Sequence, residues 1–377
     1  MKENWTYKKL GEVCEVLDSK RKPVTKADRV SGVYPYYGAT GIQDYVDKYI
    51  FDGDYLLVGE DGAKWGTNDK TAYQIHGKCW VNNHAHVLRI NDDIVKASFI
   101  EHYLVWKDLS SFITGAIVQK LTQAALISIP IPIPPLETQS RIVSELDLLQ
   151  SIIDKQKAQL KELDNLAQAV FYDMFGDPVE NEKGWDVKKL GEVCDITSSK
   201  RIFADEYVEK GVPFYRSKEV IERSKGLPIS VELFISEERY KDVKEKYGVP
   251  ELGDILITAV GTIGKIWSVN TEDPFYFKDG NLVWLRKINK EIIDSTFFRA
   301  SLVLLVEDYK EVNANGAAYN ALTIIKLKEM QCVLPPLPLQ QSFATKIESI
   351  EKQKAAITQS ITETQRLFDY TMDKYFG

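Results

Sequence analysis

The sequence predicts an α+β fold in which two tandem mixed domains each lead into one long helix. A seventeen-residue phrase, WTYKKLGEVCEVLDSKR from Trp5, returns 180 positions later as WDVKKLGEVCDITSSKR from Trp185. Short strand-like runs follow each phrase, and a heptad pattern of apolar residues closes each copy. Because this period far exceeds the roughly 20 to 50 residues of a solenoid unit, each copy is expected to form a domain of its own.

The two mixed domains are predicted from short alternating segments. The first contains strand-like runs at 54–58 and 86–90 and a helix-like stretch at 98–107, separated by glycine and asparagine turns. Its counterpart contains similar runs at 254–258 and 282–285, with another helix-like stretch after them. Strands and helices of this length are typical of a mixed α+β domain, and 377 residues give room for two or three cores.

A proline-rich strand precedes each long helix, and the heptad begins once Pro135 is passed, because proline interrupts a helix. Heptad positions then alternate at spacings of four and three through about 33 residues in each copy, which predicts two coiled-coil helices of roughly 50 Å. The apolar seam is expected to consist of Ile142, Leu146, Leu149, Ile153, Leu160, Leu163, Phe343, Ile347, Ile350, Ile357, Ile361 and Phe368.

The two helices are predicted to pair with each other, since neither buries its apolar stripe alone. The linker between the copies begins the second domain near the far tip of the first helix, which favours antiparallel pairing. The expected result is a dumbbell with a pseudo-twofold axis. Polar residues such as Gln156 and Lys354 interrupt the seam, where they either set its register or face a further helix. The predicted bounds are 1–139 and 179–340 for the mixed domains, and 140–178 and 341–377 for the helices.

Composition places the chain among soluble globular proteins, with 44% hydrophobic and 27% charged residues. We expect no signal peptide and no membrane span, because the first ten residues lack an apolar stretch and later apolar runs are short. The four cysteines are expected to be reduced and buried, which suits the cytoplasm. A net charge of −7 argues weakly against nucleic acid, although the distribution of charge matters more than its sum.

Catalytic motifs fail on inspection. Asp54, Glu60, Asp61 and Lys64 superficially resemble a nuclease set, but the gap between Asp61 and Lys64 is wrong for an acid-x-Lys pair. The glycine and lysine at 264–265 lack the remaining residues of a phosphate-binding loop.

The sequence also lacks complete motifs for metal binding and for methylation. His84 and His86 offer two metal ligands without a third at a matching spacing, so a surface or hydrogen-bonding role is expected for them. We find no paired-proline adenine-methylation motif and no glycine cluster for S-adenosylmethionine. The chain is therefore expected to be non-catalytic and to bind no metal itself.

The order of several phrases carries a resemblance to a known family. A double proline leads into Leu-x-x-Gln at 134–139, the first heptad ends in Met-Phe-Gly-Asp-Pro at 174–178, and Gly-Trp-x-x-Lys-Lys-Leu-Gly-Glu follows at 184–192. In these features the chain resembles the DNA-specificity subunit of type I restriction-modification systems over nearly its whole length. Phrases of the second domain that fit the family's target-recognition domains lie at 211–216, 252–257, 261–265 and 316–323.

The resemblance implies a reader of a split, asymmetric DNA site, with one domain on each half and the coiled coil as a ruler for the spacer. It implies partners as well: double-stranded DNA, methylation subunits that use S-adenosylmethionine on adenine, and motor or restriction subunits that use ATP and Mg²⁺. No membrane is implied. Half-sites on one face of DNA lie about 34 to 36 Å apart per helical turn, which a rod of roughly 50 Å spans.

DNA contact is expected from basic, hydroxyl and aromatic side chains in loops. Arg216 beside Tyr215 is the favoured base reader, because arginine bonds guanine bidentately in the major groove. The lysines and arginines that follow each repeated phrase are expected to bind phosphate, or else to form a solvated charge cluster. The full set is Lys20, Arg21, Lys22, Tyr36, Tyr37, Lys64, Lys200, Arg201, Tyr215, Arg216, Ser217, Lys218 and Lys265.

An alternative from another class is a non-catalytic coiled-coil scaffold whose globular ends bind protein or glycan. The acidic net charge and three tryptophans expected at the surface, Trp65, Trp80 and Trp267, favour this alternative. Salt-sensitive DNA binding separates the two hypotheses, because counterion release makes DNA affinity fall steeply with salt.

Overall fold

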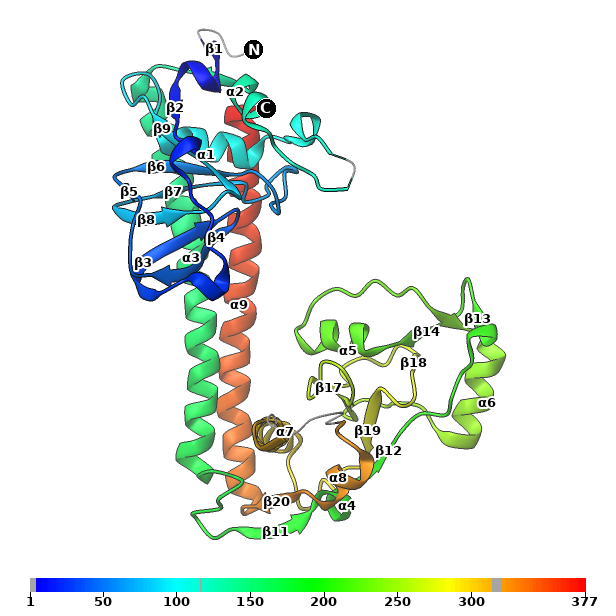
Figure 1. The fold of residues 1–377 in the computed structure, drawn as a ribbon. Helices are drawn as coiled ribbons and strands as arrows, with labels where there is room; N and C mark the ends of the chain where they lie inside the picture. The colour runs from blue at the N-terminus through cyan, green and yellow to red at the C-terminus, as the bar shows by residue number, and fades with distance from the viewer. Residues whose placement is uncertain (1–4, 116, 314–320) are drawn as a thin grey trace. The chain divides into compact units, whose positions relative to one another are not determined.

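The computed structural model describes residues 5–115, 117–313 and 321–377, and it divides into two compact units (Figure 1). The first unit comprises Met1–Ala158 and Ile357–Gly377, and the second comprises Gln159–Ala356. Each unit therefore contains one mixed domain together with parts of both long helices. The tandem α+β domains predicted from the repeat are confirmed.

The first unit contains two four-stranded sheets and one separate strand pair. One sheet has the order β2-β9-β6-β7 with antiparallel neighbours, and the other has the order β4-β3-β8-β5 with β3 and β8 parallel. The pair β1-β10 joins the repeated phrase to the proline-rich strand. The strands are β1 Thr6–Lys9, β2 Cys14–Val16, β3 Ser31–Gly38, β4 Gly41–Val46, β5 Phe51–Asp52, β6 Tyr55–Gly59, β7 Ala72–Ile75, β8 Lys78–Val81, β9 Ala85–Ile90 and β10 Pro130–Ile133.

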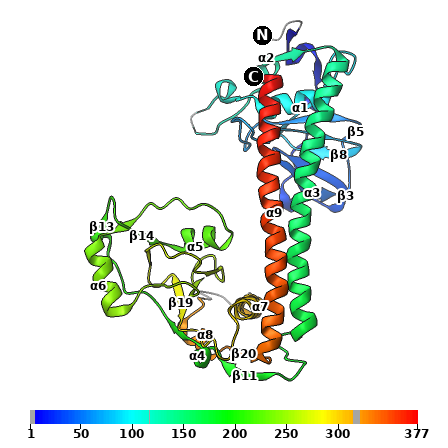
Figure 2. The same ribbon diagram turned by 180° about the vertical axis from the view of Figure 1, so that it is seen from behind.

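Helix α1 (Ala97–Trp106) covers the sheet of β6 and β7 and corresponds to the helix predicted at 98–107. Its inner face carries Phe99, whose ring lies 5.4 Å from that of Phe376 near the end of the chain. The first unit thus buries α1 between a sheet and a long helix, as both views show (Figures 1 and 2). The remaining helical segments are α2 Gln123–Ser128, η1 Leu10–Glu12, η2 Asp18–Lys20, η3 Lys26–Asp28 and η4 Ser110–Phe112.

The second unit repeats this plan. Its sheets have the orders β12-β19-β16-β17 and β13-β15-β14-β18, and the pair β11-β20 takes the place of β1-β10. The strands are β11 Asp186–Lys189, β12 Asp195–Thr197, β13 Tyr207–Val208, β14 Val212–Tyr215, β15 Phe234–Ile235, β16 Ile255–Thr258, β17 Ile266–Ser268, β18 Tyr276–Phe277, β19 Leu282–Arg286 and β20 Gln331–Leu334. The shorter helices are α4 Leu190–Val193, α5 Ser217–Ser224, α6 Glu237–Tyr247, α7 Ser295–Asn313, α8 Ile324–Glu329 and η5 Ala204–Glu206.

The long helices are α3 (Leu136–Phe175) and α9 (Leu337–Phe376), each 40 residues and so about 60 Å long. Both begin directly after a double proline, as predicted. Within the first unit they run antiparallel, because the Gln156 amide donates to Ser360 at 2.7 Å and the Tyr375 hydroxyl donates to Glu145 at 2.6 Å. Within the second unit they are again antiparallel, with Lys354 Nζ 2.8 Å from Asp164.

The seam is tightest near the mixed domains. Seven predicted seam residues are buried, namely Ile142, Leu146, Leu149, Ile153, Phe343, Ile350 and Phe368. Five are half-buried, namely Leu160, Leu163, Ile347, Ile357 and Ile361. At the last turns the burial moves to residues outside the predicted seam, namely Phe171, Phe175, Met372 and Phe376. These four join the cores of the mixed domains, which explains the change of helix face.

A buried glutamine fixes the start of each long helix to its own mixed domain. The Gln139 side chain accepts from the Lys96 backbone at 2.8 Å and donates to the carbonyls of Ile94 and Pro134. Gln340 makes the same three bonds in the second unit, where the sites are Asp294, Ile292 and Pro335. Each amide side chain is fully buried, and its hydrogen bonds are satisfied. It therefore joins the long helix to the turn before α1 in the first unit and before α7 in the second.

The cysteines of the described residues form no disulfide. Cys79, Cys194 and Cys332 are buried as predicted, whereas Cys14 is only partly buried. Burial raises the pKa of each of these thiols to about 12, which keeps them protonated and unreactive near neutral pH. None of the helices in the described part of the chain has an apolar stretch long enough to cross a membrane.

Candidate functional site

The topology of the first unit brings four loops to one edge of the sheet β2-β9-β6-β7. Strands β2 and β6 both end at this edge, and β9 and β7 both begin there, because neighbouring strands are antiparallel. The loops after β2, after β6 and before β9 therefore lie side by side. A fourth segment joins them, since the Leu121 amide donates to the Glu60 carbonyl at 2.8 Å and Asp61 forms a β-bridge with Lys120. We call this surface the loop edge of the first unit.

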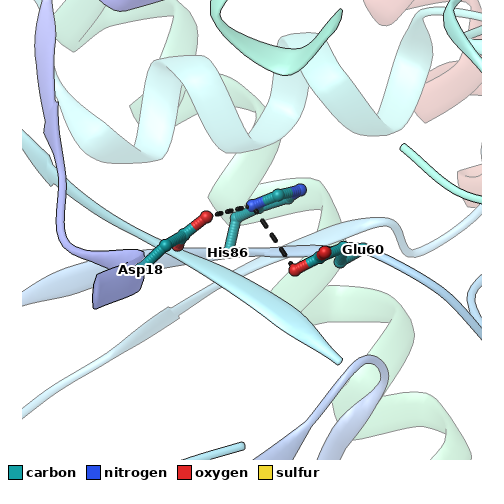
Figure 3. A group of neighbouring side chains, drawn as sticks. All are labelled: Asp18, Glu60 and His86. Carbon is teal, nitrogen blue, oxygen red and sulfur yellow. Dashed lines mark hydrogen bonds and ion pairs between the residues drawn. The ribbon is translucent and has the colours of Figure 1, made fainter. Parts of the chain in front are cut away.

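A buried network of charged side chains joins the four loops (Figure 3). Asp18, after β2, accepts from His86 Nδ1 at 2.5 Å and from the Val87 amide at 2.9 Å. Arg21 bridges Asp18 and Glu60, and Lys120 lies 2.6 Å from Glu60. His86 Nε2 donates to the Leu121 carbonyl at 2.7 Å. The side chains of the network hold the edge together, since three of its four loops have little regular secondary structure.

The electrostatics of this network favour ionised carboxylates. Burial alone would raise the pKa of Asp18, but hydrogen bonds from His86 and Val87 and the nearby Arg21 lower it below its ordinary 3.8. Burial opposes ionisation of Glu60 too, yet Lys120 and Arg21 lower its pKa below 4.5. The two ring nitrogens of His86 face a carboxylate of Asp18 and the carbonyl of Leu121, so the ring links two of the loops.

The same network explains why these groups are not a metal centre. Asp18, Glu60 and His86 place ligand atoms within 4.8 Å of one another. However, Arg21 and Lys120 already bind the carboxylate oxygens that a cation would need, so an ion would have to displace them. His86 therefore has the hydrogen-bonding role that its sequence context predicts.

The second unit presents an equivalent loop edge built from other side chains. Loops after β12 and β16 and before β19 and β17 meet there, and the Leu322 amide donates to the Ala259 carbonyl at 3.0 Å. Ser198 donates to the Leu282 carbonyl at 3.1 Å, and Arg201 donates to Asp279 at 2.8 Å. The two edges thus share their backbone arrangement but differ in the chemistry of their side chains. Residues 316–320 of the predicted 316–323 phrase lie outside the described residues.

Most of the predicted basic contacts lie on these two edges. Lys20, Lys22 and Lys64 are exposed in the loops after β2 and β6 of the first unit. Lys200 is exposed and Arg201 has 64% of its side chain exposed in the loop after β12. Lys265 is half-buried before β17 in the second unit. The structure therefore brings together, edge by edge, residues that are 40 to 65 positions apart in sequence.

Three predicted contacts are buried or already held by partners within the first or second unit. Arg21 is held by Asp18 and Glu60 with only 12% of its side chain exposed, so its charge is already neutralised. Tyr36 is 1% exposed, and its hydroxyl bonds the backbone of Val24. Tyr215 is 4% exposed and stacks on Phe275 with ring centroids 4.6 Å apart. Tyr36 and Tyr215 therefore pack within their domains, and Arg21 supports the loop edge.

Tyr37 differs from Tyr36 because it is only half-buried, and its carbonyl accepts from Asn82 in the turn before β9 at 3.0 Å. It therefore remains a candidate at the loop edge.

The Arg216 cluster is an ion-pair network. The guanidinium lies 2.8 Å from Glu219 and 2.9 Å from Glu232, and the Arg216 amide donates to Glu219 at 2.7 Å. These hydrogen bonds, that of Glu219 foremost, raise the pKa of Arg216. Lys218 is exposed and pairs with Glu232 at 2.7 Å, while Ser217 is half-buried at the start of α5. To contact a base, Arg216 would have to leave carboxylates of its own domain.

Two features escaped the sequence reasoning. A short hairpin, with described residues 114–115 and 117–120, belongs to the loop edge. In the sequence, only the corresponding phrase of the second domain indicated such a segment. Trp65 and Trp267, expected to be exposed, are 6% and 3% exposed and belong to cores. This burial removes most of the exposed aromatic surface that favoured a protein- or glycan-binding scaffold.

Comparison with known proteins identifies the family. Residues 2–165 and 182–365 each match the family described as type I restriction modification DNA specificity domain. The chain belongs to this family. Its two specificity domains correspond to the two copies of the internal repeat, and the specificity subunits of type I restriction-modification systems are non-catalytic.

Individual relatives agree with this specificity-subunit assignment. A Haemophilus influenzae protein named as a type I restriction enzyme specificity subunit is 32% identical over 373 residues, covering 97% of this chain and 93% of its own length. The specificity subunit of the MjaIX enzyme of Methanocaldococcus jannaschii is 27% identical over 68% of this chain and 61% of its own.

A solved structure shows the same fold. The crystal structure of the type I specificity subunit from M. genitalium superposes with a TM-score of 0.58 at 16% identity, and covers 99% of this chain and 96% of its own.

Proposed function

We propose that this specificity subunit recognises a split, asymmetric DNA site, with the loop edge of each mixed domain contacting one half. The observation that carries the proposal is the duplicated edge, which has the same backbone plan in both units and different side chains. Equal frameworks position two domains similarly on DNA, while different side chains give different half-sites. The net charge of −7 does not oppose this role, because each edge carries exposed cationic side chains.

The proposal includes partner subunits. The chain is a non-catalytic specificity subunit, so we propose that methylation subunits use S-adenosylmethionine to modify adenine within the site. Motor or restriction subunits would use ATP and Mg²⁺ for cleavage, and the assembly would act in the cytoplasm. The paired helices α3 and α9 would set the spacer between the half-sites, because two paired helices are stiffer than a flexible linker.

Methylome sequencing tests this function directly. A host would express the methylation and motor subunits of the same system with this chain, without it, or with a variant lacking the exposed lysines of one edge. We expect a split methyladenine motif only when the chain is present. Absence of any motif, with the partner subunits shown to be expressed and assembled, would contradict the proposal.

A further inference from the structure

The hairpin whose described residues are 114–115 and 117–120 carries the most exposed large apolar side chain of the described residues. Ile117 is 98% exposed and Val118 is 66% exposed, whereas the next such side chain, Val33, is 78% exposed on a strand. Neither hairpin residue contributes to a core cluster, so folding does not explain why they are apolar.

The stem of the hairpin is firmly held, so the exposed tip is a built feature. Thr114 and Lys120 exchange backbone hydrogen bonds of 2.9 and 2.8 Å. Gly115 has φ of +97°, and a Cβ there would lie 2.1 Å from the Val118 carbonyl oxygen, so the turn requires glycine. Lys120 is in turn bound to Glu60 of the loop edge at 2.6 Å.

We propose that Ile117 is a wedge that enters the minor groove of the half-site bound by the first domain and partly unstacks one base step. DNA-bending proteins use apolar side chains, isoleucine among them, in this way. The exposed amide of Gln119, two residues on, supplies the polar group that reads base edges in the groove. The inference rests on the proposed function, which makes DNA the ligand of this edge.

The surroundings of the tip favour DNA over a protein partner. Lys120 lies in the stem of the hairpin, and other loops of the same edge carry the exposed Lys20, Lys22 and Lys64. Positive charge on this edge attracts a phosphate backbone. Two apolar residues are far too small for a stable protein interface, which buries more than about 1,000 Å², but one isoleucine fills one base step.

The test uses the full chain assembled with its methylation subunits and duplexes that carry the methylated motif. Adenines of the first domain's half-site are replaced one at a time by 2-aminopurine, whose fluorescence rises when it is unstacked. We expect Ile117→Ser to abolish the rise at one step and to weaken binding about tenfold, comparable to one mismatched base pair. Ile117→Phe should retain both signals. Val33→Ser, at another exposed apolar residue of the first unit, should alter neither.

The outcomes separate this inference from the function on which it rests. Thermal unfolding of Ile117→Ser should match the wild type, because the side chain makes no core contact. If the wild-type complex binds the motif and Ile117→Ser behaves identically, the wedge is wrong while the proposed function stands. If Ile117→Ser loses its methylation subunits instead, the tip is a protein contact and the wedge is again wrong. If the wild-type complex does not bind the motif, the wedge and the proposed function are both contradicted.

Discussion

Charged residues at the loop edges fall into two groups with different roles. Asp18, Glu60 and Arg21 are paired inside the edge, whereas Lys20 and Lys22 project from it with exposed side chains. The first group positions the loops, and the second supplies the positive potential that attracts a phosphate backbone. The distinction matters because equal changes of charge should have different effects on stability and on DNA binding.

The exposed lysines should act through phosphate. Replacing Lys20 and Lys22 by alanine should weaken binding to all DNA sequences alike and reduce the slope of log affinity against log salt by about 2. Binding isotherms at several salt concentrations measure this slope. Lys48→Ala, an exposed lysine after β4, is the control and should change it little. A change confined to one sequence would instead mean direct base contact.

The Asp18 network should make the first unit sensitive to acid. Because the pKa values of Asp18 and Glu60 are lowered in the folded state, their stabilisation is complete above their ordinary values of 3.8 and 4.5 and is lost as pH falls through the folded values. Asp18→Asn should cost about 3 kcal/mol at neutral pH and flatten the acid dependence. Hydrogen exchange of the β9 amides between pH 7 and 3 measures both. Asp93→Asn, at an exposed aspartate, should reproduce the wild-type profile.

Arg216 should contribute more to folding than to base recognition. Glu219 is fully buried, so Arg216→Ala leaves an uncompensated carboxylate and should destabilise the second unit by about 3 kcal/mol. Arg216→Ala with Glu219→Leu should recover much of that loss, because both charges are then removed. Denaturant unfolding followed by hydrogen exchange of β16 provides the values. Unchanged stability together with relaxed specificity at one half-site would restore the base-reading role predicted from sequence.

These residues also show how far sequence reasoning reaches into the site. Residue type and position after a repeated phrase correctly predicted that basic side chains would occupy loops. They did not indicate which cations are neutralised, because the partner of Arg21 lies 39 positions away at Glu60 and the core position of Tyr36 depends on sheet packing. Contact with DNA stays a prediction for the exposed lysines, Arg201, Tyr37 and Lys265.

At the scale of elements, periodicity predicted the two long helices and the strands of the central sheets. The strand-like runs correspond to β6, β9, β16 and β19, and the long helices begin where the prolines end. The strands β3 and β4 and the helix α6 were not predicted, and two-residue strands such as β5 and β13 carry no periodic signal. The heptad also failed at the helix ends, because the mixed domains select the buried face there.

That selection makes the last turn of α9 a structural part of the first unit. Phe376 lies 5.4 to 5.8 Å from the rings of Phe99, Tyr103 and Trp106. Phe376→Ala should therefore lower the free energy of unfolding of the first unit by about 3 kcal/mol, although the change is one residue from the end of the sequence. Tyr370→Ala, at a residue 67% exposed on the same helix, should cost little. Equal effects would mean that this aromatic cluster does not hold the helix end.

At the scale of the whole molecule, the chain is interleaved. Each long helix gives its first part to one unit and its last part to the other, so the first unit combines two separate stretches of sequence, whereas the second unit is one contiguous stretch. The buried amides Gln139 and Gln340 join each domain to the start of its helix. A change in helix length is therefore passed to both domains without altering either loop edge, which is the property that a molecular ruler requires.

The ruler is tested by lengthening both helices together. One heptad is inserted after Lys157 in α3 and another after Thr358 in α9. Both positions lie next to the hydrogen bond between Gln156 and Ser360, so the two insertions face each other and preserve the seam. Seven residues add about 10 Å, so the methylated motif should keep both half-sites and gain up to about three base pairs of spacer. The matched control inserts the heptad in α3 alone, which breaks the pairing and should abolish methylation. Methylome sequencing reads all of these results, and an unchanged spacer in the double insertion would show that the helices do not set it.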